Sequence, residues 1–183
     1  AVASEQERFE RWTPFDRERF ESFLAVQARG VDELLRSAAG AMPNDPRAWL
    51  SATDLRLAVG RPADEVWGAA QRAVETDKSI RTLSRLGRVA AELASRPSLD
   101  EPAWTDEARR AWTRAAALDP RGPHFPGLLA ELEVAHGDRD EAVRWAREAI
   151  ERDDNYRLDP LAGLPDDRRR LLEDLVKAAD SGS

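Results

Sequence analysis

Residues 141–155 read EAVRWAREAIERDDN, and three similar stretches begin at Glu33, Glu65 and Glu107. Aligned without gaps, each stretch starts with Glu, has Ala at its ninth place and has Asp at its thirteenth. The starts lie 32, 42 and 34 residues apart, and recurrence at such a spacing is typical of helical repeat arrays. The recurring residues are Ala41, Ala73, Ala115 and Ala149, followed by Asp45, Asp77, Asp119 and Asp153.

The stretch at 141–155 has the apolar pattern of a helix that is buried along one side. Ala142, Trp145 and Ala149 fall at i, i+3 and i+7, which is the spacing of one helix face. The recurring Ala has a physical reason, because a methyl group lets two helix backbones approach more closely than Leu would. Pro46 and Pro120 each follow a recurring Asp, and Pro suits the first turn of a helix but not its interior. We therefore expect one helix to end at each Asp and the next to begin there.

The segments between these stretches predict the first helix of each pair. Apolar residues recur at helical spacing in 15–30, 46–60, 79–94 and 122–137. Three of these segments end in Gly, a residue that commonly follows the last turn of a helix. The sequence therefore predicts an all-α chain built from helical hairpins.

The composition supports this reading and excludes several functional classes. Of 183 residues, 34% are charged and 42% hydrophobic, and Cys is absent, which excludes disulfides and thiolate chemistry. A net charge of −7 argues against nucleic acid as a partner. No apolar run approaches the ~20 residues of a membrane-spanning helix. Arg greatly outnumbers Lys, which we attribute to codon usage rather than to function.

These units resemble the tetratricopeptide repeat (TPR), a 34-residue helix–turn–helix unit. The resemblance covers about residues 15–155 and implies a right-handed superhelix, an α-solenoid of about four TPR-like hairpins plus a C-terminal capping helix. Leu83, Leu86, Gly87 and Ala90 stand where the first TPR helix usually has Trp, Leu, Gly and Tyr. The residues that match the second-helix pattern are Ala108, Trp112, Ala115 and Pro120, and then Gly137, Ala142, Ala146 and Ala149.

The domain organisation expected from this resemblance has three parts. An N-terminal extension or short helix occupies 1–14, the repeat array 15–156, and a turn, capping helix and disordered end 157–183. RPSLDEPAW (96–104) is an insertion within the array, and its Trp104 is a candidate for a surface contact. The units are about 15–46, 47–79, 80–122 and 123–156.

No motif for catalysis or cofactor binding occurs in the sequence. His124 and His136 lack metal-ligand spacing, and there is no phosphate-binding Gly loop, nucleophile elbow or dinucleotide fingerprint. The acidic run at 153–155 lacks the residue order of a calcium-binding loop. We therefore expect no cofactor, no metal and no enzymatic activity.

One side of the predicted 79–94 helix is basic, because Arg81, Arg85 and Arg88 recur at i, i+4 and i+7. Guanidinium groups can bind carboxylates through two parallel hydrogen bonds. The alternative is a solvated basic face paired with neighbouring Glu and Asp. First helices line the concave side of such solenoids. The candidate partner contacts on them are Arg47, Asp54, Arg81, Arg85, Arg88 and Glu131.

This basic row resembles part of the carboxylate clamp with which some TPR domains hold the C-terminus of a peptide. Arg81 and Arg85 match the basic pair of the clamp's third helix, and Arg19 matches the basic place on its first helix. Phe23 and Ser51, however, stand where that clamp has Asn. The resemblance implies an acidic peptide or a C-terminal carboxylate as ligand.

The sequence therefore predicts a protein-interaction or scaffolding module that binds a peptide or partner protein in a concave groove. A second interpretation is the soluble TPR tail of a membrane-anchored bacterial cell-envelope protein, such as a polysaccharide or O-antigen polymerase or ligase. The start without Met is the observation behind it. A third interpretation, a helical enzyme, would need two groove-facing carboxylates with strongly shifted pKa values. Cytoplasm and periplasm both remain open, as does the oligomeric state.

Overall fold

The computed structural model consists of α-helices, and no β-strand occurs in the residues that it describes. It describes residues 40–96, 99, 101–136, 138–155 and 163–181, together with scattered helical positions between 19 and 37. The expected extension at 1–14, and residues 157–162 and 182–183 of the expected C-terminal part, lie outside the described residues. The helices are α3 (Pro46–Ala58), α4 (Ala63–Thr76), α5 (Ile80–Ala94), α6 (Glu101–Leu118), α7 (His124–His136), α8 (Arg139–Asn155) and α9 (Asp166–Ser181).

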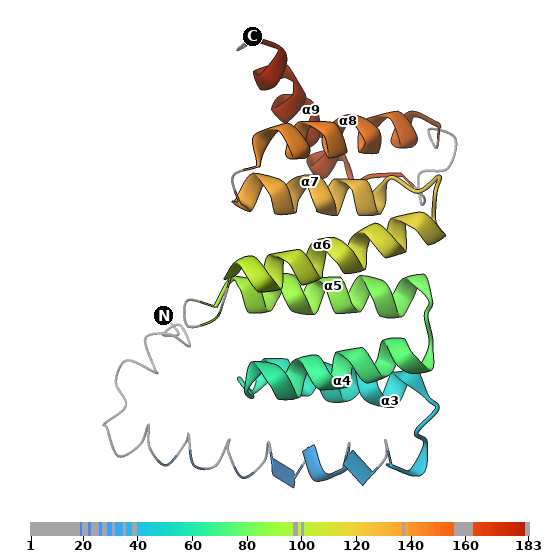
Figure 1. The fold of residues 1–183 in the computed structure, drawn as a ribbon, viewed down its shortest axis with the longest axis vertical. Helices are drawn as coiled ribbons and strands as arrows, with labels where there is room; N and C mark the ends of the chain where they lie inside the picture. Colours follow the sequence, from blue (N-terminus) through green and yellow to red (C-terminus); the bar gives the residue numbers. More distant parts are fainter. Residues whose placement is uncertain are drawn as a thin grey trace, which may run out of the picture.

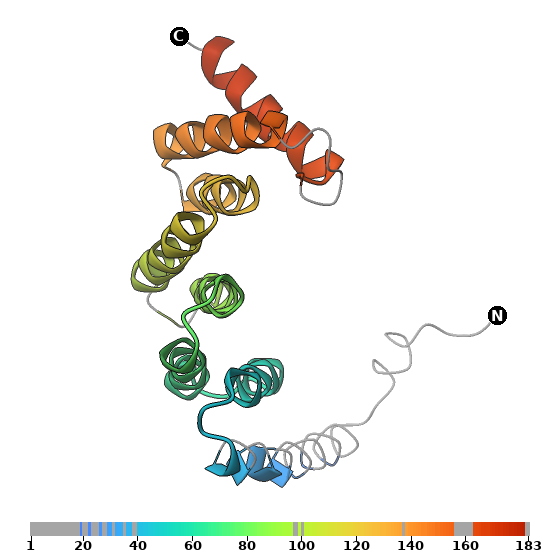
Figure 2. The same ribbon diagram turned by 90° about the vertical axis from the view of Figure 1, so that its right-hand side faces the viewer.

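The helices pack as antiparallel neighbours, α3 with α4, α5 with α6 and α7 with α8, and the pairs stack along the long axis (Figure 1). Seen from the side, α3, α5 and α7 form an inner layer, and α4 and α6 form an outer layer (Figure 2). The stack curves so that the inner layer lines the concave side. The predicted all-α solenoid with a terminal capping helix is therefore confirmed.

The recurring alanines lie where helices meet. Ala73, Ala115 and Ala149 are fully buried, as expected for small residues that allow close helix packing. The same expectation is wrong at Ala41, whose side chain is exposed at the end of its helix. Burial of the other three explains why a small side chain recurs at this place.

The recurring aspartates connect the end of each second helix to the chain that follows. Asp45 accepts a hydrogen bond from the backbone N–H of Arg47 (2.9 Å) and caps α3, which begins at Pro46. Asp119 accepts from the N–H of Gly122 (3.1 Å). Asp153 accepts from the N–H of Leu164 (2.6 Å). At the fourth place, the Asp77 carboxylate accepts instead from the hydroxyl of Ser79, the N-cap of α5 (2.7 Å). Three of the four carboxylates therefore bind backbone donors that are left free where the chain turns.

The insertion in the third unit lengthens a helix. α6 begins at Glu101, six residues before the aligned start at Glu107, so most of the described insertion residues belong to this helix or lead into it. Trp104 is half-buried and packs edge-on against Trp67 of α4, with ring centroids 5.2 Å apart. The extra turns of α6 bring the Trp104 ring against the preceding hairpin and leave it partly exposed, so the suggested surface contact stays a prediction.

Arginines connect neighbouring units through backbone carbonyls. Arg96 donates to the carbonyl of Leu57 at the end of α3 (3.3 Å), and Arg152 donates to the carbonyl of Gly122 before α7 (3.2 Å). Carbonyls near helix ends lack helical partners, and a guanidinium can reach several acceptors at once. Arg96 and Arg152 therefore have a structural use in this fold, while the attribution of the Arg preference to codon usage stays a hypothesis.

The last helix, α9, covers the apolar end of the array. Leu172 is fully buried against a cluster that includes Ala130, Ala146 and Ala149, while Leu171 on the outer face is exposed. A terminal helix with one buried and one polar face closes a solenoid without exposing its core. None of the helices in the described part of the chain combines the length and apolar character that a bilayer crossing requires.

Candidate partner-binding groove

A groove of about 440 Å³ lies between α3 and α5, two helices of the inner layer. The row at 81, 85 and 88 forms one wall, because residues spaced by three and four positions share a helix face. The groove brings together five of the six candidate contacts. Its lining residues are Arg47, Leu50, Ser51, Asp54, Arg81, Ser84, Arg85 and Arg88.

Arg85 and Asp54 form an ion pair across the groove. The Arg85 side chain is 23% exposed and that of Asp54 54% exposed, so the pair lies at the edge of solvent. The buried Nε of Arg85 has no hydrogen-bond acceptor among the described residues. The guanidinium is therefore held in place by Asp54 while part of its donor capacity is unused.

Arg81 and Arg88 are both exposed on the same wall of the groove. Within the described ranges, neither side chain forms a hydrogen bond or an ion pair. Two guanidinium groups on either side of Arg85 are therefore available to an anion from outside the chain.

The Arg47 side chain already binds a carboxylate at the start of its own helix, α3. Its Nε and Nη2 bind the two carboxylate oxygens of Asp45 at 3.0 and 2.8 Å. Hydrogen bonds from the Arg47 side chain and backbone lower the pKa of Asp45, and the same carboxylate raises the pKa of Arg47. A ligand carboxylate would have to compete with Asp45 for this guanidinium, so Arg47 is a weaker candidate than Arg81 or Arg88.

Glu131, the sixth candidate, lies apart from the other five. It belongs to α7, and its carboxylate binds Arg168 of α9 (Nε–Oε1 2.6 Å). This ion pair joins the capping helix to the array. Glu131 is not among the residues that line the α3–α5 groove. The sequence could not show this, because the pair joins residues 37 positions apart.

The clamp-like positions are brought together only in part. Arg81, Arg85 and Ser51 line the groove, and Arg19 is an exposed helical residue that is not among the groove's lining residues. Phe23 lies outside the described residues. Among the described lining residues, Asp54 is the carboxylate of the groove, and Arg85 binds it. The helical-enzyme interpretation is not tested by this geometry.

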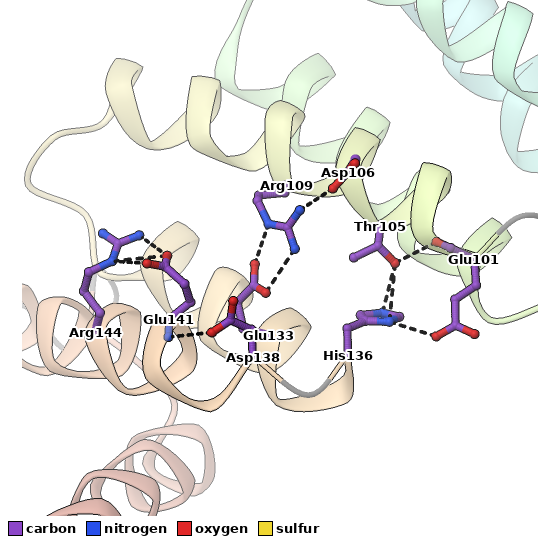
Figure 3. A network of polar contacts seen from close by, with 9 residues as sticks. All are labelled: Glu101, Thr105, Asp106, Arg109, Glu133, His136, Asp138, Glu141 and Arg144. Carbon is purple, nitrogen blue, oxygen red and sulfur yellow. Dashed lines mark hydrogen bonds and ion pairs between the residues drawn. The ribbon is translucent and has the colours of Figure 1, made fainter.

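A second polar cluster joins α6 to α7 (Figure 3). Glu133 is only 1% exposed, and Arg109 binds both of its oxygens at 2.6 and 3.0 Å. Sequence patterns alone do not predict this pair. A Glu on the apolar face of 124–136 was the available signal, but its partner is on another helix.

The same cluster places a hydroxyl, an imidazole and a carboxylate close together. His136 Nδ1 lies 2.9 Å from a carboxylate oxygen of Glu101. The Thr105 hydroxyl lies 3.3 Å from Nε2 and 3.4 Å from Nδ1 of the same ring, and it also donates to the backbone carbonyl of Glu101 (2.8 Å). A nucleophile and its base need a hydrogen bond directed at one ring nitrogen. This arrangement instead joins the end of α7 to the start of α6, as Figure 3 shows.

The described residues contain no group of three or more His, Cys, Asp or Glu side chains arranged to hold a metal ion. The expectation that the chain has neither metal nor cofactor stays a prediction.

Comparison with known proteins supports the fold. A scan against protein-family models and a search of curated proteins found no match. Among solved structures, "Crystal structure of MamA protein" has a TM-score of 0.54 at 19% identity and covers 90% of this chain and 84% of that chain. "Crystal structure of MamA" has a TM-score of 0.55 at 18% identity and covers 93% of this chain and 94% of that chain. At this identity the likeness shows the fold alone, which is that of a TPR-like helical repeat.

Proposed function

We propose that this chain is a protein-interaction module that binds an acidic segment or a C-terminal carboxylate of a partner protein in the α3–α5 groove. The observation that carries the proposal is that Arg81 and Arg88, on one wall of the groove, bind none of the described residues.

The contrast with other arginines supports this interpretation. Arg56, Arg109 and Arg169 each bind a carboxylate on another element and hold the fold together. Arg81 and Arg88 make no such contact with the described residues, although Asp54 lies in the same groove. Since the chain carries a net charge of −7, a local excess of positive charge on the concave wall favours an anionic partner.

An extended peptide suits the shape of this surface. The groove is open along its length, and the three arginines span two turns of α5, or about 10 Å. About three residues of an extended chain cover that distance. A segment with two closely spaced carboxylates can therefore contact Arg81 and Arg88 at the same time.

The test is a fluorescence anisotropy titration with a short labelled peptide that carries two Asp residues and a free C-terminus. We expect binding that weakens as salt is raised. R81A/R88A should weaken it by about tenfold or more, because each charge-assisted hydrogen bond contributes about 1.5–3 kcal/mol. The matched control is R114A/R170A, which removes two exposed arginines outside the groove.

Equal affinities for the two double variants would overturn the proposal. Amidating the peptide's C-terminus separates the two sources of negative charge. A large loss on amidation assigns the site to the terminal carboxylate, and no loss assigns it to the Asp side chains.

A further inference from the structure

A second hollow of about 590 Å³ lies between α5 and α7, over the surface of α6. α5 and α7 both contact α6, and α7 also packs against α8, so the hollow lies where the two inner helices flank α6. The ring of Trp112, only 5% exposed, lies at the base of this space. We call it the apolar hollow, and its apolar lining residues are Ala91, Ala94, Leu99, Trp112, Leu128, Leu132 and Ala135.

The charged groups around the apolar hollow are already engaged. Arg96 donates to carbonyls of the first described hairpin, and Glu131 binds Arg168. Glu101 and His136 bind each other (2.9 Å). Since these charges have partners within the chain, what the hollow offers a ligand is apolar surface.

The apolar hollow and the α3–α5 groove lie on the same side of α5. Ala91 and Ser95 continue the spacing of Arg81, Arg85 and Arg88 by steps of three and four residues. The step from Arg88 to Ala94 is six residues, or about 9 Å along the helix axis. About three residues of an extended peptide cover that distance, at roughly 3.3 Å per residue.

We propose that the apolar hollow binds a bulky apolar side chain, such as Leu or Phe, of the same acidic segment, about three residues from its carboxylate contact. This inference rests on the proposed function, because the unengaged arginines supply the charge complementarity that identifies the occupant. It adds a specificity rule: acidic residues bind the groove, and the position of one apolar residue selects the partner.

The test uses three labelled peptides in anisotropy titrations with the full chain. The first carries two Asp residues and a Leu three positions away, the second has Ala in place of Leu, and the third has Asn in place of both Asp residues. Each peptide is made with Leu before the Asp residues and with Leu after them. The order that binds more tightly shows in which direction the peptide runs along α5. We expect the first peptide to bind at least tenfold more tightly than the second, because burying a Leu side chain removes much apolar surface from water.

A pair of variants on α7 provides a matched comparison. Ala135→Trp places a large ring in the apolar hollow from an exposed position, and Val134→Trp adds the same ring at the neighbouring exposed residue, which does not line the hollow. We expect A135W to reduce the affinity of the Leu peptide to that of the Ala peptide and to leave the Ala peptide unchanged. V134W should change neither, and circular dichroism checks that both variants fold.

The outcomes separate the two proposals. If the Leu and Ala peptides bind equally, or if A135W and V134W have the same effect, the apolar hollow is not a peptide site. If the Asn peptide, made with an amidated C-terminus, binds as tightly as the Asp peptide, the proposed function fails instead. Loss of the Leu preference with retained sensitivity to R81A/R88A would overturn the inference alone. Concentration-dependent self-association abolished by A135W would assign the hollow to a second copy of the chain.

Discussion

Gly87 of α5 lies directly beneath the indole ring of Trp112 in α6, and a β-carbon at position 87 would come within 2.8 Å of Cε2 of that ring. The indole Nε1 donates to the backbone carbonyl of Ser84 (3.3 Å), which holds the ring against α5. The close contact between α5 and α6 therefore depends on the absence of a β-carbon at position 87.

Gly87→Ala should destabilise the protein even though Ala is the better helix former. The added methyl group overlaps a buried ring that is fixed by its hydrogen bond, and overpacking of this kind costs about 1–3 kcal/mol. Urea denaturation followed by circular dichroism measures the free energy of unfolding. Gly127→Ala is the control, because the nearest atom to a β-carbon there is Cδ2 of Leu164 at 3.5 Å. A stability loss in G127A that equals that of G87A would contradict the explanation.

Ala115→Leu should destabilise the protein by about 1–3 kcal/mol, since Ala115 is fully buried where helices meet. Ala117 lies two residues further along α6 and is exposed, so Ala117→Leu should change the free energy of unfolding by less than about 0.5 kcal/mol. Thermal and urea unfolding of both variants provide the comparison. If the two substitutions are equally tolerated, the recurring Ala has no packing role.

Arg109→Ala should lower the free energy of unfolding by more than the loss of a surface ion pair does. It leaves the carboxylate of Glu133 buried without its guanidinium, which we expect to cost about 2 kcal/mol, reduced from the range for fully buried pairs because Arg109 is itself 38% exposed. Arg110→Ala removes an exposed pair with Glu107 and should cost no more than about 0.5 kcal/mol. Adding Glu133→Leu to R109A should restore part of the stability, and a further loss would argue against a buried charge as the cause.

Asp32→Asn should change how stability depends on pH. Burial raises the pKa of Asp32, but the hydrogen bond and charge of Arg56 and the charges of Arg36 and Arg61 outweigh it and leave the pKa below the ordinary value of 3.8. A carboxyl group whose pKa is lowered by folding stabilises the protein above its unfolded-state pKa, and this contribution is lost as pH falls through the folded-state value.

D32N should therefore be less stable than the wild type at pH 7, and this difference should shrink as the pH falls below 3.8. Urea titrations at several pH values measure this difference. Glu92→Gln is the control, since the Glu92 side chain is exposed and its carboxylate has no hydrogen-bond or ion-pair partner among the described residues. Parallel pH profiles for the wild type and D32N would contradict a stabilising ion pair at Asp32.

The sequence by itself determined the fold class, because the period of the Glu, Ala and Asp residues and the spacing of apolar residues within helices are local properties. It also determined that Arg81, Arg85 and Arg88 share one side of a helix, since that follows from 3.6 residues per turn.

Only the tertiary structure decided which of those arginines are engaged within the chain. Asp54 lies 31 positions before its partner Arg85, and Glu131 pairs with Arg168 of the capping helix. The burial of Glu133 beside Arg109 and the space above Trp112 arise in the same way. Such contacts depend on which turn of a neighbouring helix lies opposite each side chain. The packing of whole hairpins sets this alignment, so it cannot be read from any single stretch of sequence.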